Sequence, residues 1–296
     1  MRDEIRKIQG MMEAAEYVTD APVATSVHLA MRLRKPLLIE GPAGVGKTEV
    51  AKVMARMLKT NLIRLQCYEG LDAATALYEW NYQKQLLHIK LTESSTRSAD
   101  EKEHEIFSEA FLLRRPLLQA ISQDGQAPVL LVDEVDRCDE EFEAFMLEIF
   151  AEWQVTIPEV GTIRATHPPH VILTSNRTRE LSDALRRRCL YLWIDYPTLE
   201  KEVRIVERKV PGIDARLARE VARFMETLRT LRLSKVPGVA ETLDWAQALA
   251  TLHADHLDEE LIAETLGCVL KDADDIRRFR AEVTKGGLAP FLSVPG

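Results

Sequence analysis

The sequence offers little from which a disulfide framework or a zinc site could be built. It has only four cysteines, and they lie far apart with no C-x-x-C pair: Cys67, Cys138, Cys189 and Cys268. We expect them to be reduced structural residues. The pairs His167/His170 and His253/His256 have i,i+3 spacing, but no third ligand stands near either pair. The sequence therefore gives no support for a transition-metal centre.

Long apolar runs and an excess of basic residues are also absent. No segment approaches the length of a membrane span, and residues 1–7 have no apolar core of a signal peptide. The 296 residues carry a net charge of −8, whereas general nucleic-acid or membrane-surface binders carry a basic excess. We expect a globular cytoplasmic protein of one large domain or two ordinary ones, in which only a local basic groove would bind nucleic acid.

One segment near the N-terminus has the pattern G-x-x-x-x-G-K-[ST]. It consists of Gly41, Pro42, Ala43, Gly44, Val45, Gly46, Lys47 and Thr48. An apolar run precedes it and a helical pattern follows, which is the context that a phosphate-binding loop needs. The glycines let successive N–H groups converge on an anion, and the helix adds its positive dipole end. Lys47 is predicted to reach the β- and γ-phosphates of ATP, and Thr48 to ligate Mg²⁺.

Apolar, β-rich segments alternate with helical patterns through the first two-thirds of the chain. We predict strands at residues 36–40, 62–67, 129–133, 170–176 and 190–194. The clearest helix covers residues 140–153, with Asp139 as its N-cap. This alternation predicts an α/β fold with a parallel sheet, whose ligands bind at the carboxyl ends of the strands. After Tyr196-Pro197 only helical patterns follow, which predicts an all-α domain over residues 197–296.

Polar residues follow two of the predicted strands. The strand at residues 129–133 ends in Asp133-Glu134, where Asp133 is suited to holding Mg²⁺ and Glu134 to polarising the attacking water. Two carboxylates without a cation would repel each other, so we expect a metal ion there. Asn176 ends the next strand and could bind the γ-phosphate or the water, although a turn asparagine is an equal alternative.

Three consecutive arginines, Arg186, Arg187 and Arg188, precede the fifth strand. A planar, permanent cation fits a developing phosphoryl charge, so one of them could act as an arginine finger in a neighbouring subunit of a ring. The alternative is a solubilising run at the surface.

Together these motifs resemble those of the AAA+ ATPases. Gly41–Thr48 resembles Walker A, Asp133-Glu134 resembles Walker B, and Asn176 stands at the position of sensor 1; Arg188 best matches the finger. Longer segments resemble the MoxR-type ATPases and, within them, the CoxD-like branch. These segments are residues 39–48, 65–72, 114–120, 185–189 and 194–197.

This resemblance implies a P-loop core at residues 1–196 with strand order 5-1-4-3-2, a helical lid at 197–296, and a homo-oligomeric ring, usually a hexamer. It also implies an insert at about 78–109 and a hairpin at about 154–166. Val18 becomes a candidate for the adenine pocket. Glu241 stands where relatives often carry the sensor 2 arginine, so no sensor 2 residue is assigned.

The function implied by the resemblance is Mg²⁺-dependent ATP hydrolysis that remodels a partner protein. A protein with a von Willebrand factor A domain would be the partner, and a metalloenzyme in maturation would be the client. A nucleic-acid-remodelling ATPase and a chelatase-type ATPase subunit are the alternatives, the former disfavoured by the net charge. Exposed aromatics at residues 78–82 would suit partner binding, although packing into the core is the commoner role of such residues.

Overall fold

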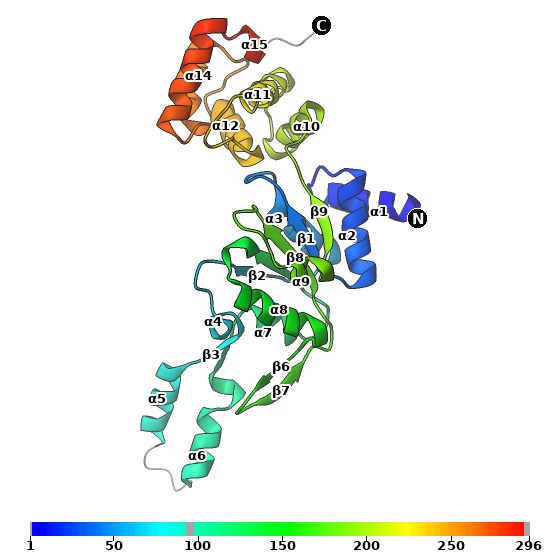
Figure 1. The fold of residues 1–296 in the computed structure, drawn as a ribbon, viewed down its shortest axis with the longest axis vertical. Coiled ribbons are helices and arrows are strands. Elements are labelled where there is room, and N and C mark those ends of the chain that lie inside the picture. The colour runs from blue at the N-terminus through cyan, green and yellow to red at the C-terminus, as the bar shows by residue number, and fades with distance from the viewer. Residues whose placement is uncertain (1, 93–97, 293–296) are drawn as a thin grey trace. The chain divides into compact units, whose positions relative to one another are not determined.

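The computed structural model describes residues 2–92 and 98–292. Its described residues form two compact units (Figure 1). The sheet unit contains those within 1–5, 21–40 and 51–192, and the helical unit contains those within 6–20, 41–50 and 193–296. Within the described ranges, no helix combines the length and the apolar character needed to span a membrane.

The sheet has five parallel strands: β1 (Leu37–Glu40), β2 (Leu62–Gln66), β5 (Val129–Asp133), β8 (His170–Ser175) and β9 (Leu190–Trp193). Their spatial order is β2-β5-β8-β1-β9, which is the predicted 5-1-4-3-2 when the five are counted along the chain. The register pairs Leu38 with Leu173 and Leu131 with Ile172. All residues of β1 and β5 are buried, as expected for a parallel sheet covered on both faces.

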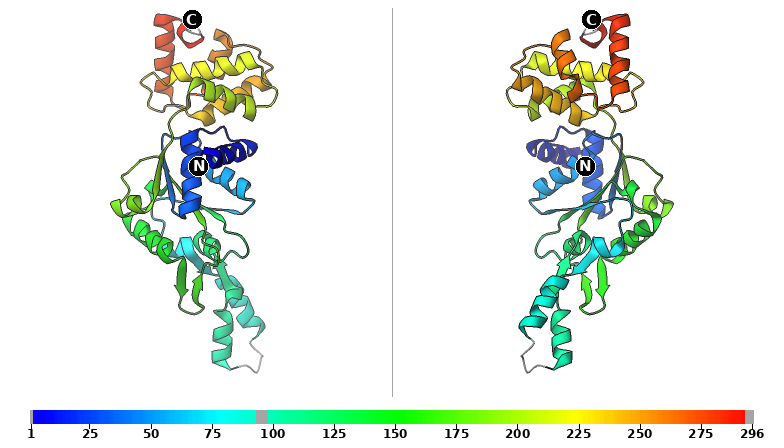
Figure 2. Two further views of the ribbon diagram at one scale, coloured as in Figure 1. Left: turned by 90° about the vertical axis from the view of Figure 1, so that its right-hand side faces the viewer. Right: turned by 90° about the vertical axis from the view of Figure 1, so that its left-hand side faces the viewer.

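Helices cover both faces of this sheet (Figure 2). On one face lie α7 (Pro116–Ile121), α8 (Glu140–Glu152) and α9 (Asp183–Arg188), which share a hydrophobic core with the strands. On the other face lies α2 (Ala21–Leu33). Asp139 caps α8 as predicted, since its carboxylate accepts a hydrogen bond from the N–H of Phe142 at 2.8 Å.

The predicted insert forms a separate extension between β2 and β5. It contains α4 (Ala73–Leu77), β3 (Tyr78–Trp80), α5 (Tyr82–Leu91), α6 (Ala99–Ile106), a 3-10 turn (Glu109–Phe111) and β4 (Leu112–Arg114). β3 and β4 pair as an antiparallel ribbon, and α5 and α6 lie side by side beyond it (Figure 1). Residues 93–97 of the insert lie outside the described residues.

The predicted hairpin is also present, as β6 (Gln154–Ile157) paired antiparallel with β7 (Gly161–Arg164). The aromatic residues of the stretch 78–82 differ in burial. Trp80 is buried and meets Phe107 edge to face, with ring centroids 5.3 Å apart, so it has the structural role. Tyr82, in contrast, is exposed.

After β9 the described chain is entirely helical. The helices are α10 (Leu199–Lys209), α11 (Ala215–Leu228), α12 (Val239–Thr251), α13 (Glu259–Thr265), a 3-10 turn (Leu266–Cys268), α14 (Ala273–Gly286) and α15 (Ala289–Leu292). The helical unit also holds most of α1 (Arg2–Ala14) and the start of α3 (Lys47–Leu58). Its core is centred on Phe224, which contacts the rings of Trp245, Phe279 and Phe291. The apolar residues of α11 are buried in this core, among them Leu217, Val221 and Leu228.

Candidate functional site

The glycine-rich loop folds around its own lysine. Gly44 and Gly46 have φ angles of +75° and +93°, which residues with a Cβ rarely adopt. Lys47 is buried, and its ammonium donates hydrogen bonds to the carbonyl oxygens of Gly41 at 2.8 Å and Pro42 at 2.7 Å. A glycine-rich loop that leads into a helix N-terminus and holds a lysine ammonium is the kind of backbone that binds a polyphosphate.

The start of the loop is fixed by a close backbone approach. A Cβ placed on Gly41 would lie 2.0 Å from the carbonyl oxygen of Ile194, so no other residue fits without displacing that backbone. Thr48 follows in the first turn of α3 and is half-buried. Val18, the candidate for an adenine pocket, is buried in the segment between α1 and α2.

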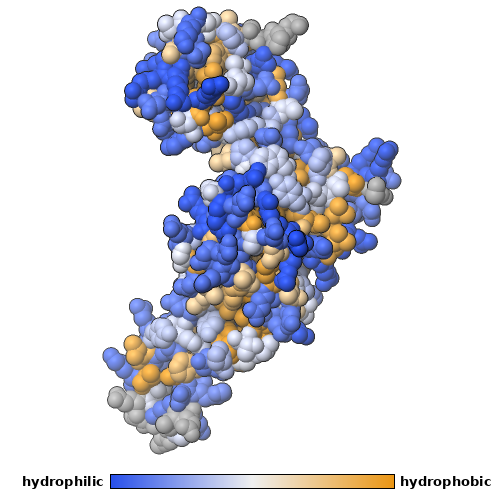
Figure 3. Space-filling view, in the orientation of Figure 1, coloured by the Kyte–Doolittle hydropathy of each residue, from blue (hydrophilic) through white to orange (hydrophobic). Residues whose placement is uncertain are grey.

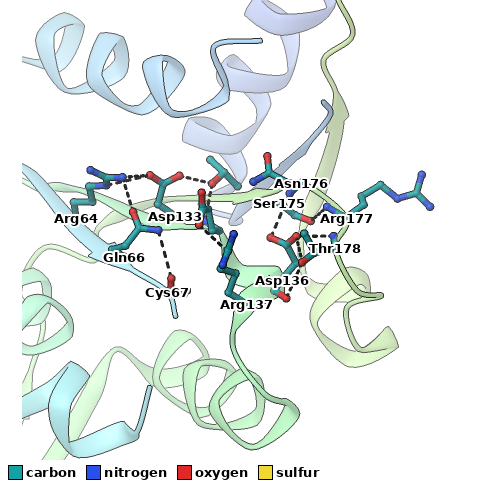
Figure 4. Close-up of polar contacts among 12 residues, drawn as sticks. Arg64, Gln66, Cys67, Asp133, Asp136, Arg137, Ser175, Asn176, Arg177 and Thr178 are labelled. Carbon is teal, nitrogen blue, oxygen red and sulfur yellow. Dashed lines mark hydrogen bonds and ion pairs between the residues drawn. The ribbon is translucent and has the colours of Figure 1, made fainter. Parts of the chain in front are cut away.

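The acidic end of β5 is organised by a hydroxyl from the neighbouring strand (Figure 4). Asp133 is buried, and its Oδ1 accepts a hydrogen bond from the Thr174 hydroxyl at 2.5 Å. The same Thr174 oxygen accepts from the N–H of Glu134 at 2.9 Å. Oδ2 of Asp133 is bound by the Arg64 guanidinium, with its Nε at 3.0 Å. Arg64 therefore supplies part of the positive charge that a buried carboxylate requires.

Glu134 has an unusual backbone conformation and an accessible carboxylate. Its φ angle is +57°, in the left-handed region that non-glycine residues seldom occupy. Such conformations persist where surrounding contacts enforce them, and they cluster at functional sites. The hydrogen bond from its N–H to Thr174 is one such contact. The side chain is about a third exposed and pairs with Arg137 at 3.0 Å.

A second buried acid holds the end of β8. Asp136 accepts hydrogen bonds from the N–H of Asn176 at 3.3 Å, from the N–H of Thr178 at 2.8 Å and from the Thr178 hydroxyl at 2.7 Å (Figure 4). The backbone of Asn176 is therefore tied to the turn that follows Glu134. The sheet unit thus brings together Asp133, Glu134 and Asn176 as predicted from their positions after β5 and β8.

Two cysteines lie beside this network, and the N–H of Cys67 donates a hydrogen bond to the carbonyl oxygen of Asp133 at 2.9 Å. Cys67 and Cys138 are both buried. A hydrogen bond with Cys138, together with burial, raises the pKa of the Cys67 thiol well above its usual range. The Cys67 thiol is therefore a poor nucleophile, as expected for a structural cysteine.

The three arginines at the end of α9 differ in their partners. Arg186 binds both carboxylate oxygens of the buried Glu40, at 3.0 and 3.1 Å, and this hydrogen bonding raises the pKa of Arg186. Glu40 also accepts a hydrogen bond from the Tyr191 hydroxyl at 3.0 Å. Arg188 donates to the carbonyl oxygen of Leu147 at 2.9 Å. The Arg187 side chain is exposed and has no hydrogen bond or ion pair within residues 2–92 and 98–292.

Glu241, at the place expected for a sensor 2 arginine, caps a helix. Its Oε2 accepts the N–H of Gly238 at 2.7 Å at the start of α12. The nearby Arg229 side chain is only 7% exposed and is bound to Glu202 through two hydrogen bonds of 2.6 and 2.7 Å. Both side chains therefore have structural partners within the helical unit.

The residues suited to a metal are few. Among the residues the structure describes, no group of three or more His, Cys, Asp or Glu side chains could hold an ion. Mg²⁺ does not require such a cage, because it usually binds one or two carboxylates plus phosphate oxygens and water. The Asp133 carboxylate and the Thr48 hydroxyl are ligands of the type it takes.

Sequence reasoning missed the supporting residues Thr174, Asp136, Arg64 and Glu40. Thr174 and Glu40 lie inside apolar strands, where a lone polar residue could have signalled a buried partner. Arg64 interrupts the apolar pattern of β2 in the same way.

Comparisons with known proteins place these features in a family. Residues 36–189, just over half of the chain, match the family described as AAA domain (dynein-related subfamily). The chain is similar to the gas vesicle ATPase GvpN of Haloferax mediterranei, with 24% identity over 286 residues that cover 89% of this chain and 78% of that protein. It is also 23% identical to an uncharacterized protein of Staphylococcus epidermidis over 227 residues, covering 75% of this chain and 78% of the relative.

Solved structures agree on the fold. A RuvB mutant matches with a TM-score of 0.52 at 17% identity, covering 95% of this chain and 80% of that one. A second RuvB mutant, from Thermotoga maritima, matches with a TM-score of 0.51 at 16% identity, covering 99% of this chain and 79% of the other. At this identity the likeness supports the architecture alone.

The Thr174 hydroxyl offers a direct test of the acidic network. We expect Thr174→Val to lower the free energy of unfolding by about 1–3 kcal/mol, because it removes the donor to Asp133 and the acceptor for the Glu134 N–H in a buried site. Thr174→Ser keeps the hydroxyl and should lose much less. Urea denaturation at neutral pH measures both. Equal stability of the valine and serine variants would contradict the role given to the hydroxyl.

Proposed function

The chain belongs to the AAA domain family (dynein-related subfamily) and is an ATPase, and from this premise we propose that it couples hydrolysis of Mg²⁺-ATP to the remodelling of a partner protein. The observation that carries the proposal is the hydrogen-bonded end of β5 and β8, where a partly exposed Glu134 is set beside a buried Asp133. A loop that only binds nucleotide needs no carboxylate held in the left-handed conformation.

Each residue has a defined role in this proposal. Lys47 and the loop N–H groups bind the phosphates, and Thr48 and Asp133 hold Mg²⁺. The ion, when bound, neutralises charge on the β- and γ-phosphate oxygens. Glu134 accepts a proton from the attacking water, and Asn176 orients the γ-phosphate or that water.

The arginine partners favour Arg187 as the finger. Arg186 compensates the buried Glu40, and Arg188 holds a carbonyl of α8. Both side chains are therefore already engaged within their own subunit. The Arg187 side chain has no such partner in the described part of the chain. It is therefore the arginine best able to stabilise charge in a neighbouring subunit's site. We therefore prefer it to Arg188, the best match by position, in a ring that AAA ATPases commonly form.

A protein is favoured over nucleic acid as the remodelled partner. Helix α5 of the insert exposes five large apolar or aromatic side chains: Tyr82, Leu86, Leu87, Ile89 and Leu91. Figure 3 shows hydrophobic residues gathered over this part of the insert. An apolar face of this kind suits an apolar protein surface rather than a phosphate backbone. The β6–β7 hairpin, in turn, has one cation, Arg164, which binds the Gln154 side chain.

The finer assignment rests on the sequence resemblance to CoxD-like, MoxR-type ATPases. On this resemblance, the partner is a von Willebrand factor A protein and the client is a metalloenzyme in maturation. Both would be met in the cytoplasm. A chelatase-type subunit would use the same hydrolytic residues. A nucleic-acid remodeller is the alternative of a different class, and the capture experiment below separates it from the first two.

Two substitutions test the hydrolytic site. Lys47→Ala should abolish ATP binding, because it removes the loop's cation. Glu134→Gln should bind ATP normally but hydrolyse it about 100-fold more slowly or worse, because the amide cannot accept the proton of the water. Isothermal calorimetry and phosphate release measure the two effects. Normal turnover by the Glu134→Gln protein would remove Glu134 from the mechanism.

The finger is tested by complementation between subunits. Arg187→Ala should reduce kcat by about 10³-fold or more, whereas Arg188→Ala should lose mainly stability. Mixing inactive Arg187→Ala and Glu134→Gln proteins should restore part of the ATPase rate, since some sites then combine an intact Glu134 with an intact Arg187 of a neighbour. No recovery on mixing, or full activity of the Arg187→Ala protein alone, would show that another arginine acts.

The partner is tested with the Glu134→Gln protein held in ATP. We expect it to capture a von Willebrand factor A protein from its native lysate, and Leu87→Lys in the same background to reduce recovery at least several-fold. Leu252→Lys is the matched control, because Leu252 is 57% and Leu87 58% exposed, and Leu252 lies in another part of the chain. Capture of nucleic acid instead, or equal recovery by both lysine variants, would contradict the proposal.

A further inference from the structure

Helix α12 begins on the phosphate loop. The N–H groups of Val239 and Ala240 both donate to the carbonyl oxygen of Gly44, at 2.9 and 3.2 Å. The first N–H groups of a helix have no partner within the helix and are usually satisfied by a capping side chain or by water. Here the loop backbone is their partner, so the end of the helix and the middle of the loop are joined within the helical unit.

Glycine is required at position 238 because the loop backbone comes so close there, and not because of its own backbone angles. Its φ and ψ of −89° and −169° are extended angles that any residue adopts. A Cβ there, however, would lie 2.7 Å from the carbonyl oxygen of Ala43 and 2.7 Å from the Cα of Gly44. Both atoms belong to backbone that cannot rotate away, so a larger residue would push α12 off the loop.

Gly44 is constrained from the other side of the same contact. Its φ of +75° already favours glycine. A Cβ there would also lie 3.1 Å from the Cα of Gly238 and 3.2 Å from Oε2 of Glu241. The Glu241 carboxylate is fixed in place by the Gly238 N–H that it caps. The two glycines therefore face each other, backbone to backbone.

This contact determines how one loop amide is oriented. In a planar trans peptide the C=O and the N–H point in opposite directions. Because two helix N–H groups hold the Gly44 carbonyl toward α12, the N–H of Val45 in the same peptide is held away from α12. Val45 lies between the two left-handed glycines of the loop, among the amides predicted to bind phosphate.

We propose that Gly238 is a positioning residue for nucleotide binding. Because Gly238 has no Cβ, the first N–H groups of α12 can hold the Gly44 carbonyl, and this fixes the orientation of the Val45 N–H before nucleotide binds. The lid helix is then coupled to the bound nucleotide through backbone rather than through a sensor 2 cation. The inference rests on the proposed ATP site. It gives the helix-capping Glu241 a function at the position where a sensor 2 arginine is expected.

Gly238→Ala tests the steric part of the proposal. We expect it to raise the Kd for ATP and the KM about tenfold with a smaller change in kcat, in a protein that still unfolds in one cooperative thermal transition. Gly267→Ala is the control, because a Cβ at Gly267 meets nothing within 4 Å and its φ is not positive. Unchanged ATP affinity of a folded Gly238→Ala protein would overturn the proposal.

Val239→Pro tests the hydrogen bond without adding a clash at Gly238. Proline is well tolerated at the first position of a helix, and the extended Gly238 suits a following proline, but the donor to Gly44 is lost. We expect affinity to fall about fivefold, the value of one ordinary hydrogen bond. Val239→Ala removes most of the side chain but keeps the N–H, and it should bind ATP more tightly than the proline variant. Equal affinities of the two variants would contradict the role of this N–H.

Hydrogen exchange supplies a readout independent of turnover. In the wild-type protein ATP should slow amide exchange at residues 239–243, and this protection should be lost in the Gly238→Ala and Val239→Pro proteins. If the wild type binds ATP, Lys47→Ala does not, and residues 239–243 stay unprotected, then the ATP site stands and this coupling fails. If the wild type itself binds no ATP, the proposed function fails first.

Discussion

A buried carboxylate must be compensated by hydrogen bonds or by a cation, and this requirement determines which residues surround the proposed hydrolytic site. The buried acids of the described residues are Glu40, Asp133, Asp136, Glu143, Glu202 and Asp275. Each has specific partners: Asp133 has Thr174 and Arg64, and Asp136 has the backbone of Asn176 and Thr178. An unpaired carboxylate in such a place would cost several kcal/mol. The partners are therefore held as firmly as the acids, and the residues proposed for catalysis lie next to them.

The same requirement separates arginines that are alike in sequence. Arg186 is committed to Glu40, directly before the phosphate loop, and Arg229 is committed to Glu202 in the helical unit. Such cations stabilise the fold, because the carboxylates that they compensate are buried. A cation that acts on substrate must be free of such a partner, and Arg187 meets that condition within the described residues.

Much of the fold could be predicted because its signals are local. The strands follow from apolar runs, α8 from its spacing and its Asp139 cap, and the strand order from a family resemblance that the structure confirms. Asp133, Glu134 and Asn176 could be placed together because parallel strands end at one edge of a sheet. Thr174, Arg64 and Gly238 could not be found in this way. Their contacts join residues far apart in the sequence, and each depends on distances of a few tenths of an ångström.

The insert has a further consequence for how this protein could diversify. Its helices α5 and α6 are attached through the two-stranded ribbon of β3 and β4, whose antiparallel pairing brings the two ends of the insert next to each other. A segment attached in this way can lengthen, shorten or be exchanged without moving a strand of the sheet. Mutations in the insert and mutations in the sheet can therefore act independently of each other. Under the proposed function, changes in α5 would therefore alter partner binding while the strands that carry Asp133 and Asn176 stay the same.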